Sequence, residues 1–516
     1  MKTESRCLRM IKKKMVRVLT VAGLLACLAS GCASGGSSVG KEAAADEIKK
    51  GGFTVAASCH DPQILREGDT YYMFGSHMVG AKCQDLRKWN YFANGVDAAN
   101  TLFDNLLTEP YAAFDFVGKN TDNGYSVWAS NVIYNETMKK YVMYFCTTSS
   151  YVKSTLCFAT ADNIEGPYTY VDTILYSGYG KSNISETNLY DVLGKNADIS
   201  RYLEYGGYNN KEWPNCIDPA IFTDADGRMW MNYGSWSGGI FLLEIDPTTG
   251  YPIYPVDDKD ADPYYGYRLI GGGHHSAEGP YIQYDAENSY YYLFVSYGDL
   301  QSDGGYQIRQ FRSEKPTGPY VDVAGNTLED QDDHFNYGLK MMGNYTFPSL
   351  NYTYMAPGGQ STFQDDDGKY YITYHQRFDD GTEYHEPRVH QMYTNEDGWF
   401  VAAPFATMGE TLSEKGYKKS DVSGTFYVVN HGTDISSKIR EAEAYTFADG
   451  KVTGGEKSGT YEVKEGTDYI TITLDGVVYK GVLMEMTDEA ENPVFCFSAA
   501  GDNEETLWGV QYIKKE

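Results

Sequence analysis

One pattern occurs five times along this chain and limits the folds open to it. Each copy is a run of aromatic and β-branched residues, an Asx or Gly turn, and a second such run, which is the pattern of a β-hairpin. The copies begin with residues 60–65, 130–134, 217–222, 278–282 and 360–363. Repeats of roughly 60–90 residues exceed the usual propeller-blade period of about 40–50 residues, so insertions must separate some blades. The predicted fold class is therefore all-β, a five-bladed β-propeller.

The copies differ in the polar residue at the head of each unit. These head residues are Asp61, Asn131, Asp218, Glu278 and Gln360. Symmetry-related elements thus deliver three carboxylates that closure of the ring would bring together. Each acid could simply cap a turn, but three such caps of one charge would repel one another. Clustered carboxylates shift one another's pKa values, which is typical of acid–base chemistry.

The N-terminal region predicts export from the cytoplasm. A basic stretch at residues 12–17 precedes an apolar run, 18–28, that is too short to span a bilayer comfortably. Residues 28–32 resemble a bacterial lipoprotein cleavage box with Cys32 as the lipidated residue; plain secretion is the alternative. We therefore expect a signal peptide over 1–32, a flexible linker over 33–53, and an extracellular protein attached to the membrane only through its lipid.

The net charge argues against two kinds of binding partner, and the pattern of the C-terminal residues predicts a second domain. The formal net charge of −28 argues against nucleic acid and anionic membrane surfaces. From about residue 411 the chain changes to short alternating strands with tight turns, such as 469–474 and 477–483. We expect the catalytic propeller over 54–410 and a small β-barrel or sandwich over 411–516, with the propeller able to fold alone after truncation near Leu412. A monomer is expected.

Three short motifs carry a family resemblance. They are His60-Asp61-Pro62, Ile217-Asp218-Pro219-Ala220 and Ala277-Glu278-Gly279-Pro280-Tyr281. In this order they resemble the signatures of glycoside hydrolase family 43, and the chain looks most like the extracellular endo-α-1,5-L-arabinanases, which join a five-bladed propeller to a C-terminal barrel. The resemblance implies an inverting glycosidase acting on arabinan, with Asp61 as general base, Glu278 as general acid, and Asp218 as the residue that orients the acid and raises its pKa.

The resemblance also implies an ion on the propeller axis. His375 lies at the end of the fifth copy and is the metal candidate, with calcium as the expected ion. The alternative is a packed core histidine, because calcium prefers oxygen ligands.

Sugar rings stack on exposed aromatic side chains, which gives the candidates for substrate binding. The aromatic candidates are Trp128 and Trp236. Asn131, at the head of the second copy, and His275, just before Glu278, are the other candidates for contact with the substrate. The segment 128–131 reads Trp-Ala-Ser-Asn where the family often has Trp-Ala-Pro-Asp, a departure that weakens the inference of substrate contacts at this segment.

Two other functions stay open. An exo-acting α-L-arabinofuranosidase or β-xylosidase of the same family would have the same three acids, and the long insertions at 91–124 and 177–213 decide neither way. A non-catalytic glycan-binding lipoprotein would not need all three acids, so their presence argues against it.

Overall fold

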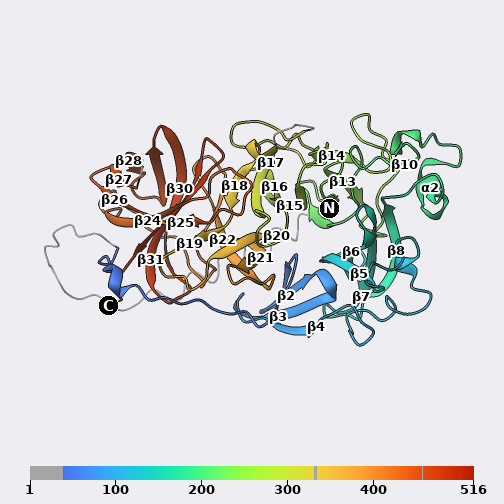
Figure 1. Ribbon diagram of the computed structural model, residues 1–516, viewed down its shortest axis with the longest axis horizontal. Coiled ribbons are helices and arrows are strands. Elements are labelled where there is room, and N and C mark those ends of the chain that lie inside the picture. The colour runs from blue at the N-terminus through green and yellow to red at the C-terminus, as the bar shows by residue number, and fades with distance from the viewer. Residues whose placement is uncertain (1–38, 330–333, 456, 516) are drawn as a thin grey trace, which may run out of the picture. The chain divides into compact units, whose positions relative to one another are not determined.

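Five antiparallel sheets arranged as blades make up most of the chain (Figure 1). The computed structural model describes residues 39–329, 334–455 and 457–515. The strands of the first three blades are β1 (Gln63–Glu67), β2 (Thr70–Gly75), β3 (Val79–Cys83), β4 (Asn90–Ala93); β5 (Ser126–Asn135), β6 (Lys140–Ser150), β7 (Lys153–Ala161), β8 (Thr169–Tyr176); and β11 (Ala220–Thr223), β12 (Met229–Tyr233), β13 (Ile240–Ile245), β14 (Tyr267–Ile270). Those of the last two are β15 (Ala277–Asp285), β16 (Tyr290–Tyr297), β17 (Gln307–Ser313), β18 (Leu339–Met342); and β20 (Tyr354–Gln364), β21 (Tyr370–Phe378), β22 (His385–Thr394), β23 (Phe400–Ala402). The predicted five-bladed, all-β propeller is confirmed.

The C-terminal part is a closed barrel of eight strands. They are β24 (Gly424–Asn430), β26 (Glu443–Ala448), β27 (Lys451–Gly454), β28 (Lys457–Val463), β29 (Tyr469–Leu474), β30 (Val477–Thr487), β31 (Pro493–Gly501) and β32 (Thr506–Tyr512). Along β29 buried and half-buried residues alternate strictly, because one face of the strand lines the barrel interior. Residues 141–147 of β6 are all buried, since both faces of a blade pack against other parts of the fold.

Side chains of the inner strands join each blade to the next. The bonds run from Gln63 Nε2 to Val132 O (3.3 Å), Ile221 N to Asn131 Oδ1 (3.1 Å), Asn232 Nδ2 to Pro280 O (2.7 Å), Gln360 Nε2 to Gly279 O (2.7 Å), and Ser361 Oγ to Pro62 O (2.8 Å). The last bond joins blade five to blade one and completes the ring. Each bond of this kind contributes about 0.5–1.5 kcal/mol net, and losing one partner leaves a buried polar group unsatisfied at greater cost. The buried polar residues near the axis therefore close the propeller.

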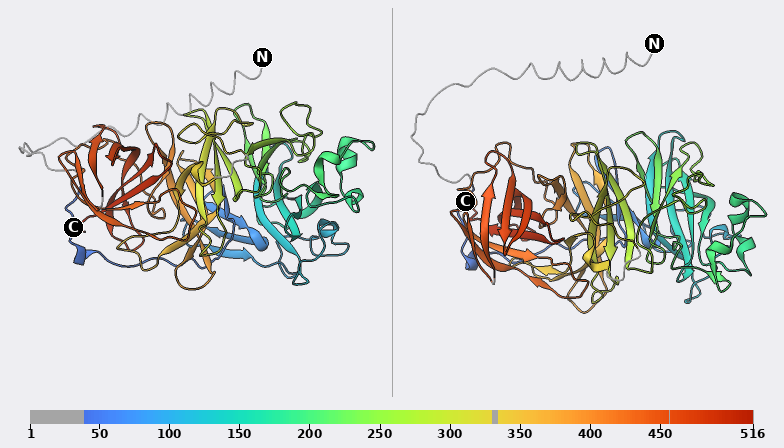
Figure 2. Two further views of the ribbon diagram at one scale, coloured as in Figure 1. Left: turned by 45° about the horizontal axis from the view of Figure 1, so that its top comes forward. Right: turned by 90° about the horizontal axis from the view of Figure 1, so that it is seen from above.

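Short elements fill the connections. They are the 3₁₀ helices η1 (Ala45–Glu47), η2 (Ser76–Met78), η3 (Ala112–Phe114), η4 (Ile184–Glu186), η5 (Ser200–Tyr202) and η6 (His334–Asn336), the helix α2 (Leu189–Leu193), and the strand pair β9 (Leu203–Glu204) and β10 (Gly207–Tyr208). Both views of Figure 2 place the α2 insertion, drawn in green, at the margin of the propeller. The second long insertion, residues 177–213, thus carries little regular structure.

The boundary between propeller and barrel is not a simple linker. Strand β19 (Tyr345–Thr346) pairs in antiparallel fashion with β20 and in parallel fashion with β25 (Arg440–Glu441), so a strand from beyond residue 411 completes the sheet of blade five. Residues 39–516 form one compact unit. The two β-domains therefore share a sheet and a core.

Part of the segment expected to be a flexible linker is bound to the barrel. Glu42 forms an isolated bridge with Ile513, and the Ala43 N–H donates to Tyr512 O at 2.8 Å. Gly51 forms a second isolated bridge, a parallel one, with Leu350, which precedes β20 of blade five. Backbone pairing therefore ties Glu42, Ala43 and Gly51 to the rest of the fold, within the range 33–53 for which a flexible linker is expected from the sequence.

The predicted signal peptide and Cys32 lie outside the described residues. Among the residues described, no helix is long and apolar enough to cross a membrane.

Candidate active site

The heads of all five inner strands share an unusual backbone conformation. Asp61, Ala129, Asp218, Gly279 and Gly359 have φ between 47° and 57°, in the left-handed region. Register shifts mark the same place in blades two, four and five, between Trp128 and Asn131, Glu278 and Tyr281, and Gly358 and Ser361. For residues other than glycine this conformation costs about 1–3 kcal/mol and persists only where the surroundings impose it.

These positions correct the expected alignment of the five heads. The structural equivalents of Asp61 and Asp218 are Ala129, Gly279 and Gly359, rather than Asn131, Glu278 and Gln360. The extra residue of each bulge displaces the polar side chain by one or two positions, which hydrophobic patterning does not reveal. The convergence of the heads is nevertheless as predicted.

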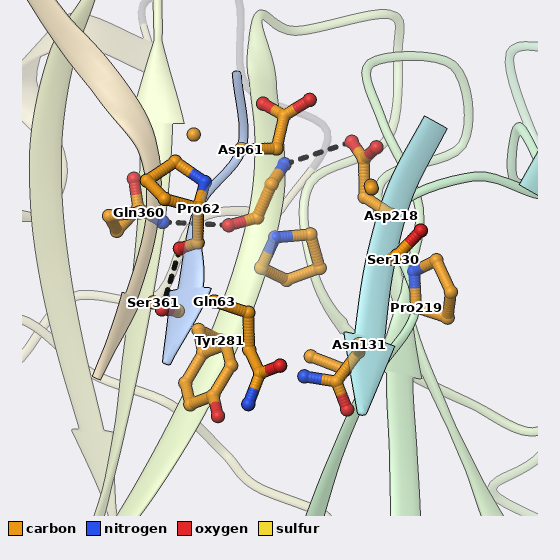
Figure 3. Close-up of a pocket in the computed structure, with 15 residues that line it drawn as sticks. Asp61, Pro62, Gln63, Ser130, Asn131, Asp218, Pro219, Tyr281, Gln360 and Ser361 are labelled. Atoms are coloured by element: carbon orange, nitrogen blue, oxygen red, sulfur yellow. Dashed lines mark hydrogen bonds between the residues drawn. The ribbon is translucent and has the colours of Figure 1, made fainter. Parts of the chain in front are cut away.

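All five heads line one pocket on the propeller axis (Figure 3). Asp61 and Asp218 lie at one end of it, and Gln63, Tyr281 and Asn131 lie at the other. The pocket also contains Gly279, which follows Glu278 in the chain. The N–H of Gly279 donates to Asp218 Oδ2 at 3.2 Å. Blades one, three and four therefore bring Asp61, Asp218 and Glu278 close enough for their charges to interact, with Asp61 and Asp218 in the pocket and Glu278 beside it.

Asp61 is held in its ionised form. Its Oδ2 accepts a hydrogen bond from Ser76 Oγ at 2.5 Å and lies 2.7 Å from His60 Nδ1. Burial alone would raise the pKa of Asp61, but the charge and hydrogen bond of His60, together with the Ser76 bond, hold that pKa below its usual range. A carboxylate of this kind can accept a proton from water.

Glu278 and Asp218 are shifted in the opposite direction. Burial raises the pKa of Glu278, although hydrogen bonds from Tyr306 (2.7 Å) and Ser235 (3.0 Å) oppose the rise. The pKa of Asp218 is raised well above its usual range by burial and by the negative charges of Asp61 and Glu278. Asp218 and Glu278 therefore form a coupled pair that retains a proton more readily than Asp61 does.

A row of three stacked rings connects Asp61 to Glu278. His60 and His375 stack with centroids 4.0 Å apart and planes 24° apart, and His375 stacks on Tyr306 at 5.7 Å and 20°. His60 contacts Asp61, and Tyr306 contacts Glu278. The packing of three rings thus fixes how the candidate base lies relative to the candidate acid.

The predicted substrate-binding residues divide into two groups. Asn131 lines the pocket, although its Oδ1 is already used to join blades two and three. Trp128 and Trp236 are half-buried and pack beside His77 (5.3 Å) and His274 (5.5 Å). His275 stacks on His334 at 4.7 Å and does not line the pocket.

The exposed histidine near the acid is instead His274. Its Nδ1 lies 2.8 Å from the hydroxyl of Tyr151, which is 55% exposed and contacts Ser237 at 3.0 Å. Neither Tyr151 nor Tyr306 has a sequence signal that separates it from the other 45 tyrosines.

Sequence reasoning also missed two serines whose signal was available. Ser76 and Ser235 follow Gly75 and Gly234 at the ends of the second strands of blades one and three, and each donates to a catalytic candidate. His375 occupies the corresponding place in blade five, opposite Gly358. The repeat itself therefore marks the positions that face the acids.

The metal candidate His375 is fully buried at the site. His60, Asp61 and His375 offer ligand atoms within 4.8 Å of one another, and His375 Nδ1 lies 4.0 Å from Asp61 Oδ1. Both ring nitrogens of His375 are buried without a hydrogen-bond partner among the described residues. These orphaned nitrogens fit an absent ligand. The donors include two imidazoles and one carboxylate, so a calcium ion here would take most of its oxygen ligands from water.

Comparisons with known proteins agree with the fold and the site. Residues 192–400 match the model of glycosyl hydrolases family 43, and residues 404–509 match a C-terminal lipocalin-like domain that accompanies it. The chain is 38% identical over 467 residues to extracellular endo-α-(1→5)-L-arabinanase 2 of Bacillus subtilis, covering 88% of this chain and 92% of that relative. It is 36% identical over 472 residues to the extracellular endo-α-(1→5)-L-arabinanase of Thermotoga petrophila, covering 88% and 94%.

Solved structures extend the likeness to three dimensions. The family 43 glycoside hydrolase YxiA of Bacillus licheniformis has a TM-score of 0.78 at 36% identity, covering 89% of this chain and 99% of that one. The endo-1,5-α-L-arabinanase of Thermotoga petrophila has a TM-score of 0.77 at 34% identity, covering 90% and 100%. Fold and site together define a propeller glycosidase. The chain belongs to glycoside hydrolase family 43.

Proposed function

We propose that this enzyme is an inverting endo-α-1,5-L-arabinanase. The observation that carries the proposal is the interaction of three acids from three different blades. Asp61 and Asp218 line one axial pocket, and Glu278 adjoins Gly279, whose N–H donates to Asp218. The substrate class comes from the relatives named endo-arabinanases, which match this chain over nearly their whole length.

In the proposed reaction Asp61 and Glu278 act on opposite sides of the glycosidic carbon. Asp61 takes a proton from a water molecule as that water attacks the anomeric carbon, and Glu278 gives its proton to the leaving oxygen as the bond breaks. Asp218 holds the Gly279 amide beside Glu278 and shares the proton of the pair. One attack by water inverts the anomeric configuration.

Two exposed tyrosines hydrogen-bond to residues that neighbour the site in sequence and could offer rings to a bound polymer. Tyr151, beside His274, approaches from blade two. Tyr91 is 39% exposed, and its hydroxyl donates to Ser58 O, two residues before His60.

Product analysis tests the proposal. Linear arabinan should give a ladder of oligosaccharides early in the reaction, whereas xylan and aryl xylosides should stay intact. Release of arabinose alone from the first minutes would instead identify the exo-acting alternative.

Bound ion, location and assembly are parts of the same proposal. We propose a cation at His375, calcium by the family resemblance, where it would add positive charge beside Asp61. Stoichiometric metal in purified protein, absent from His375→Ala, would support it; metal-free wild type with full activity would return His375 to a packing role.

The relatives' names support a secreted enzyme, and we propose lipid attachment at Cys32 and a monomeric state. Cys32→Ser should release the enzyme from the cell surface if the lipid holds it there. Light scattering of the released enzyme should give the mass of one chain.

A further inference from the structure

A groove between blades one and two lies away from the catalytic pocket. We call it the blade 1–2 groove; its walls include Leu65, Glu67, Tyr72, Tyr134, Tyr141 and Glu165. Strands β1 and β5 contribute to both places, with Gln63 and Asn131 at the axial pocket and Leu65 and Tyr134 at the groove. A strand rises about 3.3 Å per residue, so the groove begins roughly 7–10 Å farther along the same two strands. The groove is therefore a separate site, carried by the same rigid elements.

Three tyrosines, Tyr72, Tyr134 and Tyr141, line the groove. Tyr134 is 40% exposed, and its ring lies against the buried ring of Tyr141 with centroids 5.1 Å apart. The Tyr141 hydroxyl donates to Glu67. The exposed ring thus rests on a partner that is itself fixed, so it can offer an apolar face without losing much side-chain freedom on binding.

The charges around the groove are matched within the chain. Arg66 pairs with Asp365, Lys82 with Glu165 (2.6 Å), Lys139 with Glu136 (2.8 Å) and Lys140 with Asp162 (2.7 Å). Because each cation at the groove already has a carboxylate partner, a negatively charged ligand would gain little there. The carboxylate oxygens remain able to accept hydrogen bonds from hydroxyl groups.

An apolar ring face beside hydrogen-bond acceptors, with no uncompensated positive charge, matches the chemistry of a neutral sugar chain. We propose that the blade 1–2 groove is a second binding site for a neutral polysaccharide, which holds the enzyme on its substrate while the axial pocket cleaves. The identity of the sugar rests on the proposed function, since arabinan is the polymer that the enzyme would meet. Two linked contacts with one polymer raise the effective concentration of the catalytic pocket at its surface.

Affinity electrophoresis of full-length protein tests this site without hydrolysis. All variants carry Asp61→Asn, so that the polysaccharide in the gel stays intact. Tyr134→Ala removes the exposed ring, and Tyr134→Phe keeps the ring without its hydroxyl. Tyr352→Ala is the matched control, because Tyr352 is 52% exposed and also rests on another ring, that of Phe378 at 5.7 Å, outside the groove.

In a gel containing linear arabinan, Tyr134→Ala should lose roughly threefold to tenfold in affinity, as expected for one sugar–ring contact. Tyr134→Phe and Tyr352→Ala should migrate like the parent. Equal affinities for Tyr134→Ala and Tyr352→Ala, or no retardation of the parent in any neutral polysaccharide, would overturn the proposal.

A parallel assay separates this proposal from the proposed function. In the active enzyme, Tyr134→Ala should hydrolyse arabinotriose at the wild-type rate and show a higher KM on polymeric arabinan. The wild type could fail to cleave arabinan while gels of galactan or arabinoxylan retard the parent and not Tyr134→Ala. That result would uphold the groove as a polysaccharide-binding site and would contradict the arabinanase assignment.

Discussion

The Tyr306 hydroxyl donates a hydrogen bond of 2.7 Å to Oε1 of Glu278, and the same ring stacks on His375. A phenol in this position does two things. It fixes where the acid points, and it favours the ionised carboxylate, so that it lowers the pKa of Glu278 against the rise caused by burial. The acid is therefore tuned by two opposing effects.

Tyr306→Phe should change both activity and its pH dependence. Loss of one hydrogen bond to a charged group costs about 1.5–3 kcal/mol, so we expect kcat on arabinan to fall roughly tenfold or more. The pKa of Glu278 should rise without the donor, and the acid must be protonated to act. The alkaline limb of the kcat profile should therefore move to higher pH. A lower kcat with an unmoved limb would show that Tyr306 only fills space.

Gly359→Ala should damage the site more than the fold. An added Cβ would lie 2.3 Å from Asp61 Oδ1 and 2.8 Å from His375 Nδ1, at a φ of +57°. Gly368→Ala is the matched control, since its φ is +87° and a Cβ there meets no atom within 4 Å. Both variants should lose about 1–2 kcal/mol of unfolding free energy to the left-handed backbone, and Gly359→Ala should lose more, because Asp61 or His375 must move. Only Gly359→Ala should lose most activity, at least about 100-fold, because Asp61 must move.

Truncation near Leu412 should destabilise the propeller, contrary to the expectation from sequence. It removes β25 from the sheet of blade five and removes Trp508, whose ring lies 5.1 Å from Tyr345 and 6.1 Å from His390. It also removes Glu489, which accepts a bond from Tyr354 and lies 4.0 Å from the buried guanidinium of Arg388. Thermal unfolding of the truncated chain should begin well below that of the full chain. An unchanged Tm would show that the shared sheet contributes nothing.

Glu278→Gln and Asp61→Asn should differ in which substrates they spare. Protonation matters for a poor leaving group, so Glu278→Gln should nearly abolish cleavage of arabinan while retaining part of the activity on aryl arabinofuranosides. Asp61→Asn should abolish both, since both need an activated water. Initial rates on the two substrates measure the difference, and equal losses on both for Glu278→Gln would argue against its role as the acid.

The sequence predicted which side chains converge on the axis where two copies of the repeat carry the same residues. Asp61 and Asp218 each precede proline at the same place in a hairpin, so their convergence followed from ring closure. The exact equivalence of the heads did not follow, because a left-handed bulge leaves no trace in hydrophobic periodicity. Tyr306 directly precedes β17, which is separated from the strand of Glu278, β15, by β16, so its contact with Glu278 depends on side-chain packing rather than on local pattern. The pairing of β19 with β25, which joins the propeller to the barrel, was not predicted either, because β25 is only two residues long.

Proton NMR of the first turnover on an α-L-arabinofuranoside tests the division of labour between Asp61 and Glu278 most directly. A single attack by water, activated by Asp61, predicts β-L-arabinose as the first product, which then equilibrates to the mixture of anomers. An α-configured first product would require two displacements and a covalent intermediate, and it would contradict the roles assigned to both residues.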